Sequence, residues 1–256
     1  MKIQTDVVLE IVKNTKELFL DRERVSQVRE KGLADFVTQV DIQVQEQVKQ
    51  ALYERYPEIQ FFGEEKDNSE VDFKRDVWIL DPVDGTTNLI HDFRNSTLSL
   101  ALYHDGKITF GVVYHPYSDE IFLAKRGEGA WCNDKPIHVS TAKKMQESLI
   151  SIGTSPYYKE LAEENFNLFR RIFLASEDIR RLGSAALELA YVASGRIEAY
   201  FERNLKPWDY AAGMLLIEEA GGTFTNFNGE KIDVGKNADV VASNGNIGDI
   251  LVKEYL

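Results

Sequence analysis

Apolar side chains recur at helical spacing near the start of the chain and at strand spacing in its middle. Apolar positions three and four residues apart predict an amphipathic helix over about residues 3–22 and a second over about 38–56. Thr38, followed three residues later by Asp41, is typical of a helix N-terminus, and Pro57 ends this helix. Short β-rich runs then predict strands at 59–62, 77–80, 96–103, 107–114 and 120–124, with a hairpin turn at 104–106. Residues 125–140 contain Gly and Asn and predict turns.

The second half of the chain alternates between strand and helix patterns. Strands are expected at 149–152, 197–201, 223–227 and 240–243, and helices at 157–174, 184–193, 208–220 and 247–255. Gly221-Gly222 is a helix stop. The sequence therefore predicts an α+β half over residues 1–145 and an α/β half over residues 146–256. Because no low-complexity linker separates them, we expect the two halves to pack together.

Composition is that of an ordinary globular protein. A chain of 256 residues is long enough to bury a sizeable core. Its single cysteine, Cys132, excludes an intramolecular disulfide and fits a reducing compartment. No apolar run approaches the length of a bilayer span, and the first residues lack the pattern of a signal peptide. We therefore expect a cytoplasmic protein that has no membrane contact.

The net charge of −12 weighs against a nucleic-acid-binding protein, which normally carries a basic patch. An acidic chain also looks unsuited to anionic substrates, unless bound cations invert the sign of the electric field at the site. Part of the acidic excess would then consist of metal ligands, and most of it would be solvated surface. We expect no nucleic-acid partner.

The segment from Trp78 to Asn88 carries the strongest chemical signal in the chain. An apolar run ends in Asp81 and Asp84, with Pro82 and Gly85 marking a sharp turn that can direct both carboxylates to one spot. Converging carboxylates suit a hard cation such as Mg²⁺, and the N–H groups of Gly85-Thr86-Thr87 suit a phosphate. This combination predicts metal-assisted phosphoryl chemistry. Taken alone, the same string is also compatible with an acidic surface turn.

Further motifs follow the same logic. Gly63-Glu64-Glu65 ends another apolar run, and Pro207-Trp208-Asp209 opens an apolar helical segment with a carboxylate in its first turn. In this order, the motifs resemble the inositol monophosphatase family, which belongs to a larger group of Mg²⁺-dependent, lithium-sensitive phosphatases. The resemblance runs from about Lys31 to Asn244 and implies a layered αβαβα sandwich. Its motifs are Gly63-Glu64-Glu65, Asp81-Pro82-Val83-Asp84-Gly85-Thr86-Thr87-Asn88 and Trp208-Asp209, with weaker matches at 127–133 and 183–186.

A set of metal ligands follows from the motifs and the resemblance. Asp81 is the best candidate to bridge two cations, because it ends the strand and lies between Glu64 and Asp84. The resemblance implies that Glu64, Asp81 and the Val83 carbonyl bind a first Mg²⁺. It further implies that Asp81, Asp84 and Asp209 bind a second, with a third, weaker Mg²⁺ near Glu64. We therefore expect two to three Mg²⁺ per site, with Mn²⁺ as a substitute, and a site between the halves.

The nucleophile is expected to be a metal-activated water, because no His or Cys occurs in these motifs. The resemblance implies that Thr86, supported by Asp41, orients or deprotonates this water, and Glu64 could share that role. The N–H groups of Gly85 and Thr86 should hold phosphate oxygens. Lys31 matches a family lysine, although the chain is one residue shorter between Lys31 and Asp41. Glu65 either supports the ligands or is exposed.

The motifs indicate the residues that contact the leaving group less directly than they indicate the metal ligands. The resemblance implies that Asp84, Ala185, Glu202 and Asp209 contact substrate hydroxyls. Glu202 follows a predicted strand and could accept hydrogen bonds from a polyol; the alternative is an exposed strand-end acid. Nearby Arg203 and Lys206 could instead meet a second phosphate, which would favour a bisphosphate or nucleotide substrate.

The sequence thus predicts a Mg²⁺-dependent phosphomonoesterase acting on myo-inositol 1-phosphate or a similar small polyol or sugar monophosphate. Within the same class, the alternatives are a fructose-1,6-bisphosphatase, an NADP(H) phosphatase and a 3′-phosphoadenosine 5′-phosphate phosphatase. From another class, the alternative is a non-catalytic regulatory protein that binds RNA or the transcription machinery. The resemblance also implies a homodimer, which is the commonest oligomeric state of soluble proteins.

Overall fold

The computed structural model describes residues 3–32 and 35–256. Its helices are α1 (Thr5–Lys13), α2 (Lys16–Leu20), α3 (Arg22–Val25), α4 (Gln39–Arg55), α5 (Thr86–Ile90), α6 (Ala162–Ala175), α7 (Ala185–Ala193), α8 (Pro207–Glu219) and α9 (Asn246–Glu254). The first strands are β1 (Val28–Gly32), β2 (Asp35–Thr38), β3 (Gln60–Gly63), β4 (Val77–Asp84), β5 (Thr97–His104), β6 (Lys107–His115) and β7 (Glu120–Lys125). The others are β8 (Gly129–Cys132), β9 (Lys135–Pro136), β10 (Leu149–Ile152), β11 (Asp178–Arg180), β12 (Ala199–Leu205), β13 (Thr223–Thr225) and β14 (Ala238–Ser243).

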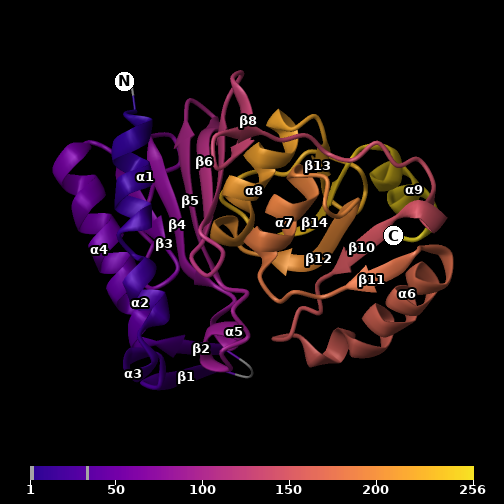
Figure 1. The fold of residues 1–256 in the computed structure, drawn as a ribbon, viewed down its shortest axis with the longest axis horizontal. Helices are drawn as coiled ribbons and strands as arrows, with labels where there is room; N and C mark the ends of the chain where they lie inside the picture. The colour runs from indigo at the N-terminus through magenta and orange to yellow at the C-terminus, as the bar shows by residue number, and fades with distance from the viewer. Residues whose placement is uncertain (1–2, 33–34) are drawn as a thin grey trace.

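The elements form five layers, as Figure 1 shows from left to right. Helices α1 and α4 cover one face of a seven-stranded sheet, and α7 and α8 fill the space between that sheet and a five-stranded one. Helices α6 and α9 cover the outer face of the second sheet. Three separate apolar clusters fill the spaces between neighbouring layers. This is the αβαβα sandwich that the resemblance implies.

The first sheet has the order β3-β4-β5-β6-β7-β8-β9, and only its β3–β4 pair is parallel. All eight residues of β4 are buried, which explains its continuous apolar run. Trp78 and Leu80 face the α1/α4 layer, whereas Val77 and Ile79 face α7 and α8. The alternation of a strand therefore brings the end of β4 to the middle layer.

The second sheet is mixed, with the order β11-β10-β12-β14-β13. Strand β10 runs parallel to both of its neighbours, whereas β14 is antiparallel to β12 and β13. Helix α7 is buried along almost its whole length between the two sheets, which accounts for its sequence of mostly alanine and aliphatic residues. The N-termini of α7 and α8 meet the same cavity as the end of β4.

The single helix predicted over residues 3–22 is wrong. Two short helices, α1 and α2, lie in this range, and α3 starts at its end; between α1 and α2 the Thr15 hydroxyl donates to the Val12 carbonyl. Asp21 then starts α3 by accepting hydrogen bonds from the backbone N–H groups of Glu23 and Arg24. The helix predicted at 38–56 is confirmed as α4.

Several short strands were not predicted from the sequence. Strands β1, β2 and β11 were missed, and β8 and β9 lie in residues 125–140, where only turns were expected. These strands have two to five residues each, which is too short for a clear alternation. Strand β12 continues to Leu205, past its predicted end at 201, and α6 begins at Ala162 rather than at 157.

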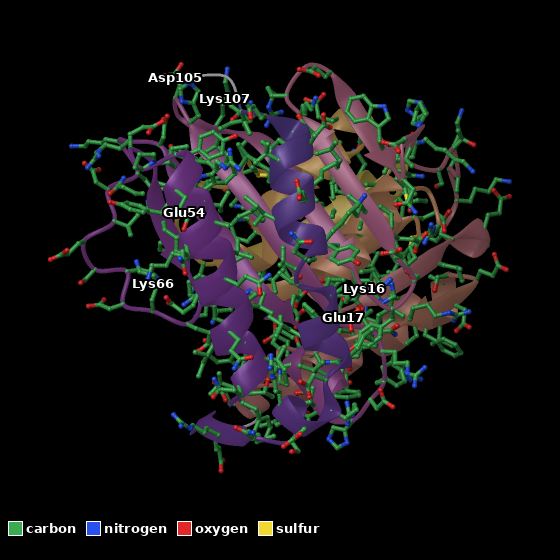
Figure 2. All side chains as sticks on the ribbon, turned by 60° about the vertical axis from the view of Figure 1, so that its left-hand side comes forward. Lys16, Glu17, Glu54, Lys66, Asp105 and Lys107 are labelled. Carbon is green, nitrogen blue, oxygen red and sulfur yellow. The ribbon has the colours of Figure 1, made fainter. Side chains whose placement is uncertain are left out.

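The outer surface of the α1/α4 layer is polar. Figure 2 shows the charged side chains of Lys16, Glu17 and Glu54 on this side of the molecule, outside the apolar cluster that α4 covers. None of the helices in the described ranges has both the length and the apolar character that crossing a membrane requires.

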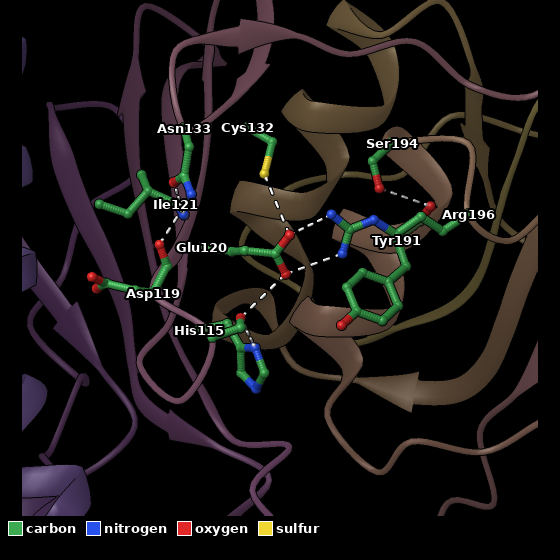
Figure 3. A network of polar contacts seen from close by, with 10 residues as sticks. His115, Asp119, Glu120, Ile121, Cys132, Asn133, Tyr191, Ser194 and Arg196 are labelled. Atoms are coloured by element: carbon green, nitrogen blue, oxygen red, sulfur yellow. Dashed lines mark hydrogen bonds and ion pairs between the residues drawn. The ribbon is translucent and has the colours of Figure 1, made fainter.

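A polar network joins the first sheet to the end of α7 (Figure 3). Both carboxylate oxygens of Glu120 pair with the guanidinium of Arg196, which also lies over the Tyr191 ring at 4.8 Å. The thiol of Cys132 lies 3.8 Å from the same carboxylate, and burial raises the pKa of this thiol. Cys132 therefore belongs to a packing contact, with a thiol poorly suited to act as a nucleophile.

Candidate active site

A cavity of about 560 Å³ opens where β4, α7, α8 and β12 meet. All five predicted metal ligands line it: Glu64, Asp81, Val83, Asp84 and Asp209. The predicted substrate contacts Gly85, Thr86, Ala185 and Glu202 line it as well. The fold therefore brings together side chains that are up to 145 residues apart in the sequence.

The end of β4 is shaped by the Asp-Pro-Val-Asp turn. The register of β4 against β5 is irregular between Asp81 and Asp84, and Asp81 Oδ1 accepts a hydrogen bond of 3.0 Å from the Val83 N–H. Asp84 Oδ2 accepts hydrogen bonds from the Ser184 hydroxyl (2.7 Å) and the Ala186 N–H (2.6 Å). The start of α7 thus holds Asp84 in a fixed orientation.

Gly85 is required where it stands. Its φ of +87° lies in the left-handed region, and a Cβ there would come within 2.9 Å of the Gly183 carbonyl oxygen. Residues 85–87 therefore pass close to the 183–186 segment at the cavity wall. Among the described residues, no hydrogen bond is formed by the backbone N–H groups of Gly85 and Thr86, which leaves them available to an anion.

Asp41 lies beneath the cavity and does not line it. Its Oδ2 accepts a hydrogen bond from the Thr38 N–H (2.8 Å), and its Oδ1 accepts one from the Thr86 hydroxyl (2.9 Å). The Thr86 hydroxyl also lies 3.1 Å from the Val83 carbonyl oxygen. A hydroxyl donates only one hydrogen, so donation to Asp41 leaves the Val83 carbonyl free to bind another group.

Glu64 and Asp209 approach the same space from other elements. Glu64 follows β3, and its N–H donates to the Leu80 carbonyl of β4 (3.2 Å). Asp209 is in the first turn of α8, where its Oδ2 accepts a hydrogen bond from the Lys206 N–H (2.7 Å). This capping contact orients the Asp209 carboxylate toward the cavity that it lines.

The carboxyl cluster is electrostatically strained without a cation. Burial raises the pKa of Asp81 well above its usual value, and Glu64, Asp84 and Asp209 raise it further. Burial also raises the pKa of Asp84 to about 6, although hydrogen bonds from Ser184 and Ala186 act in the opposite direction. The pKa of Asp209 is raised by burial and by Asp84. These acids repel one another until a positive charge is placed among them.

The donor set fits Mg²⁺ in chemical type, since every donor is an oxygen. Within residues 3–32 and 35–256, no group of three or more Asp, Glu, His or Cys side chains is already arranged so that it could hold a metal ion. Mg²⁺ does not need such a cage, because it is commonly held by one or two carboxylates together with waters and substrate phosphate. The observation that supports the fit is the mutual repulsion of these buried carboxylates, which raises the pKa values of Asp81 and Asp209 and which a bound cation would relieve.

Glu202 forms the other end of the cavity with Gly153. It lies within β12 rather than after a strand, and its two oxygens accept hydrogen bonds from the Ser155 N–H (2.7 Å) and the Tyr200 hydroxyl (2.5 Å). The alternative of an exposed strand-end acid is therefore wrong. A Cβ on Gly153 would lie 2.1 Å from the Glu202 carboxyl carbon, so only glycine leaves room for this side chain.

Of the two positively charged residues expected near the leaving group, Arg203 and Lys206, only Lys206 lies at the cavity. Arg203 pairs with Glu164 and Asp239 and lies over the Phe227 ring at 4.9 Å, away from the cavity lining. The hypothesis that Arg203 meets a second phosphate is therefore wrong. Lys206 does line the cavity. The Lys31 side chain lies outside the described part of the structure, and Glu65 is half-buried and does not line the cavity.

Sequence reasoning missed several residues that line this cavity, notably Glu188, Arg181, Tyr157 and Gly153. Glu188 left a signal, because it is the single charged residue in the otherwise apolar run of α7. Arg181 and Tyr157 left none, since both lie in polar segments that read as ordinary surface.

Comparison with known proteins identifies the relatives of this chain. Residues 1–255 match the model of the inositol monophosphatase family. A protein named inositol-1-monophosphatase from Rhizobium meliloti is 39% identical over 203 residues, which are 79% of this chain and 76% of the relative. A protein named Nus factor SuhB from Xylella fastidiosa is 39% identical over 205 residues, which are 79% of this chain and 73% of the relative.

Solved structures agree with these relatives. The extragenic suppressor protein suhB from Bartonella henselae superposes with a TM-score of 0.91 at 34% identity, covering 98% of this chain and 99% of that one. A dual specific IMPase/NADP phosphatase, solved with D-inositol-1-phosphate, superposes with a TM-score of 0.82 at 30% identity, covering 93% of this chain and 90% of that one.

Proposed function

The chain belongs to the inositol monophosphatase family, and on that premise we propose that it is a Mg²⁺-dependent phosphomonoesterase. The proposed substrate is myo-inositol 1-phosphate or a similar small polyol or sugar monophosphate. The observation that carries this proposal is the convergence of Glu64, Asp81, Asp84 and Asp209 on one cavity, beside backbone N–H groups of residues 85 and 86 that form no hydrogen bond within the described residues. A chain that kept only the fold would not need all four acids together.

The ligands divide into two groups around Asp81. Glu64, Asp81 and the Val83 carbonyl would hold a first Mg²⁺, and Asp81, Asp84 and Asp209 would hold a second. When bound, these cations supply charge neutralisation for the phosphate and lower the pKa of a bound water, so that the water becomes nucleophilic near neutral pH. A third, weaker Mg²⁺ near Glu64 and replacement by Mn²⁺ belong to the same proposal.

Thr86 and Asp41 orient the attacking water. The Thr86 hydroxyl donates to Asp41, which leaves its own oxygen lone pairs directed away from that bond and able to accept a hydrogen from the water. If the Thr86 hydroxyl takes a proton from the water, its own proton would pass along this hydrogen bond to the buried Asp41 carboxylate, which Thr38 holds in place. Glu64, at the same cavity wall, is placed to share the role of base.

The phosphate and the leaving group would contact different groups of the cavity lining. The N–H groups of Gly85 and Thr86 would bind phosphate oxygens. Asp84, Ala185, Glu202 and Asp209 would contact the hydroxyls of the alcohol, with Glu202 accepting hydrogen bonds through the remaining lone pairs of its carboxylate.

The proposal is tested by Mg²⁺-dependent release of phosphate from a panel of esters. The panel contains inositol monophosphates, fructose 1,6-bisphosphate, NADP⁺ and 3′-phosphoadenosine 5′-phosphate. We expect the highest kcat/KM with a polyol monophosphate, no turnover after chelation of Mg²⁺, and inhibition by Li⁺ at the second cation position. Full activity after exhaustive chelation would rule out the proposed chemistry.

A nucleotide phosphatase is the second candidate. Arg181 and Lys206 line the cavity together with Tyr157, so a cationic and aromatic surface lies beside the carboxyl cluster. Such a surface suits a leaving group that carries a further phosphate and a base, and one structural relative is named a dual IMPase/NADP phosphatase. A higher kcat/KM with NADP⁺ than with any polyol phosphate would favour this candidate.

A regulatory role is the third, because one relative is named a Nus factor. The feature that favours it here is an apolar stripe on the outer face of α6, where Phe166, Phe173 and Leu174 are exposed. If binding to the transcription machinery were the main function, replacement of Asp81 would leave that function intact while replacement of Phe166 and Phe173 would abolish it.

A further inference from the structure

Glu188 is a buried carboxyl that the proposed reaction does not use. It lies in α7 with only 1% of its surface exposed, and that surface faces the active-site cavity. A glutamate is rarely buried to this extent unless it is paired or has a function. Glu188 therefore calls for an explanation in terms of the cavity.

Within residues 3–32 and 35–256, only Oε1 of the Glu188 carboxyl accepts hydrogen bonds from the protein. Oε1 accepts hydrogen bonds from the Leu182 N–H (2.6 Å) and the Ser151 hydroxyl (3.0 Å). From the part of the chain that the structure describes, Oε2 receives no hydrogen bond. The neighbouring Glu202 differs in this respect, because both of its oxygens are engaged by the protein.

The surroundings of Glu188 favour its neutral form. Burial raises its pKa to about 8, and the Glu202 carboxylate raises it in the same direction. Burial also raises the pKa of Glu202, but hydrogen bonds from the Tyr200 hydroxyl and the Ser155 N–H oppose that shift. The Leu182 and Ser151 hydrogen bonds and the positive charge of Arg181 oppose this shift. The titratable groups facing this corner are Glu202 and Tyr200 from β12 and Arg181 from the segment before α7. With Oε1 accepting two hydrogen bonds, the proton of the neutral acid belongs on Oε2.

We propose that Glu188 selects the leaving group by donating a hydrogen bond from Oε2 to a hydroxyl of the substrate alcohol. Glu202 accepts a hydrogen bond at the same end of the cavity. One donor beside one acceptor recognises two neighbouring hydroxyls, so the substrate class is a phosphate ester of a vicinal diol or polyol. This inference rests on the proposed phosphatase function and adds a residue that selects among its substrates.

The readout is a selectivity ratio, defined as kcat/KM for inositol 1-phosphate divided by kcat/KM for p-nitrophenyl phosphate, whose leaving group has no further hydroxyl. Glu188→Gln places an N–H donor where Oε2 was and keeps an acceptor for Leu182 and Ser151. Its ratio should stay within about twofold of wild type near neutral pH, whereas Glu188→Met should lower the ratio about tenfold, the worth of one hydrogen bond. Glu198→Gln is the matched control. Like Glu188, Glu198 accepts a hydrogen bond from a backbone N–H, that of Leu149, but it does not line the cavity.

A pH series separates selection from a structural role. The wild-type ratio should fall as the pH rises through about 8, where Glu188 ionises beside Glu202, while the Glu188→Gln ratio should stay flat. Because both substrates are attacked by the same nucleophile, pH effects on that nucleophile cancel in the ratio. If Glu188→Met does not fold, this comparison decides alone.

Two results would overturn the inference. One is a wild-type ratio with the same pH dependence as that of Glu188→Gln; the other is a Glu188→Met variant that is active on both substrates with an unchanged ratio. In both cases the Mg²⁺-dependent hydrolysis itself would remain. Absence of Mg²⁺-dependent hydrolysis of either ester by the wild type would instead remove the proposed function together with this inference.

Discussion

At the scale of single residues, the leaving-group end of the cavity depends on a glycine. A Cβ at Gly153 would lie 2.1–2.3 Å from three carbons of Glu202, so Gly153→Ala must displace that side chain. We expect kcat/KM for a polyol phosphate to fall about tenfold and the free energy of unfolding to fall by about 1–3 kcal/mol. Steady-state kinetics and denaturant unfolding measure the two effects. The control is Gly248→Ala in α9, whose Cβ would press on Ser243 at the end of β14; this variant should lose stability but keep its kinetics.

The raised pKa values of the carboxyl cluster predict how the stability of the protein depends on pH. The folded-state pKa values of Asp81, Asp84 and Asp209 are raised above their unfolded values, so these three groups bind more protons in the folded chain than in the unfolded chain from about pH 4 to at least the Asp84 pKa of about 6, which outweighs the opposite contribution of the single buried His115. Stability must therefore fall as the pH rises through this window. In a chelator, Tm should drop by a few degrees between about pH 5 and pH 7, and Mg²⁺ should reduce the drop. A Tm that rises with pH in chelator would contradict the assignment.

At the scale of elements, the N-terminus of α4 contributes both to the stability of the fold and to the positioning of active-site residues. The Thr38 hydroxyl accepts a hydrogen bond from the Val40 N–H and donates one to Asp41 Oδ2, and Asp41 in turn holds Thr86. Thr38→Ala should lower the free energy of unfolding by about 1 kcal/mol, as expected for loss of an N-cap, and should also reduce kcat. Asp21→Ala removes the cap of α3, none of whose residues lines the cavity, and should reduce stability alone. Equal kcat values for the two variants would contradict the link from Thr38 to Thr86.

Comparison of predicted and observed elements shows which features of the site could be predicted from the sequence. The turn from Asp81 to Gly85 was predictable, because its chemistry is local and its spacing sets the geometry. Glu202 was misplaced because whether a strand ends at Phe201 or continues to Leu205 depends on pairing with β14, which the sequence does not display. Arg203 was misassigned because its ion partners, Glu164 and Asp239, are distant in the chain. Burial of Glu188 follows from packing between two sheets rather than from its neighbours in sequence.

At the scale of the whole molecule, we propose a homodimer. The resemblance to the family favours it, and closed two-fold dimers are the commonest soluble assemblies. Light scattering at micromolar concentration should give a mass of twice the 29.2 kDa chain. A mass near that of one chain would contradict this proposal without affecting the chemistry of the cavity.

The central claim is that Asp81 bridges two cations in a phosphatase site. Asp81→Asn is nearly isosteric but removes a negative charge from the centre of the cluster, which should cost ~4 kcal/mol or more of transition-state stabilisation. Folding should be preserved, because removing one of several repelling carboxylates relieves repulsion. Asp249→Asn, which removes an exposed carboxylate from α9, is the matched control and should behave as wild type.

The most direct test is Mg²⁺-dependent phosphate release by wild type, Asp81→Asn and Asp249→Asn, measured over a Mg²⁺ titration with the preferred ester. We expect kcat of Asp81→Asn to fall by about three orders of magnitude, with a folded protein that Mg²⁺ stabilises less than it does the wild type. If Asp81→Asn retains more than about a tenth of the wild-type kcat with the same Mg²⁺ dependence, Asp81 is not the bridging ligand and the assignment of the site fails.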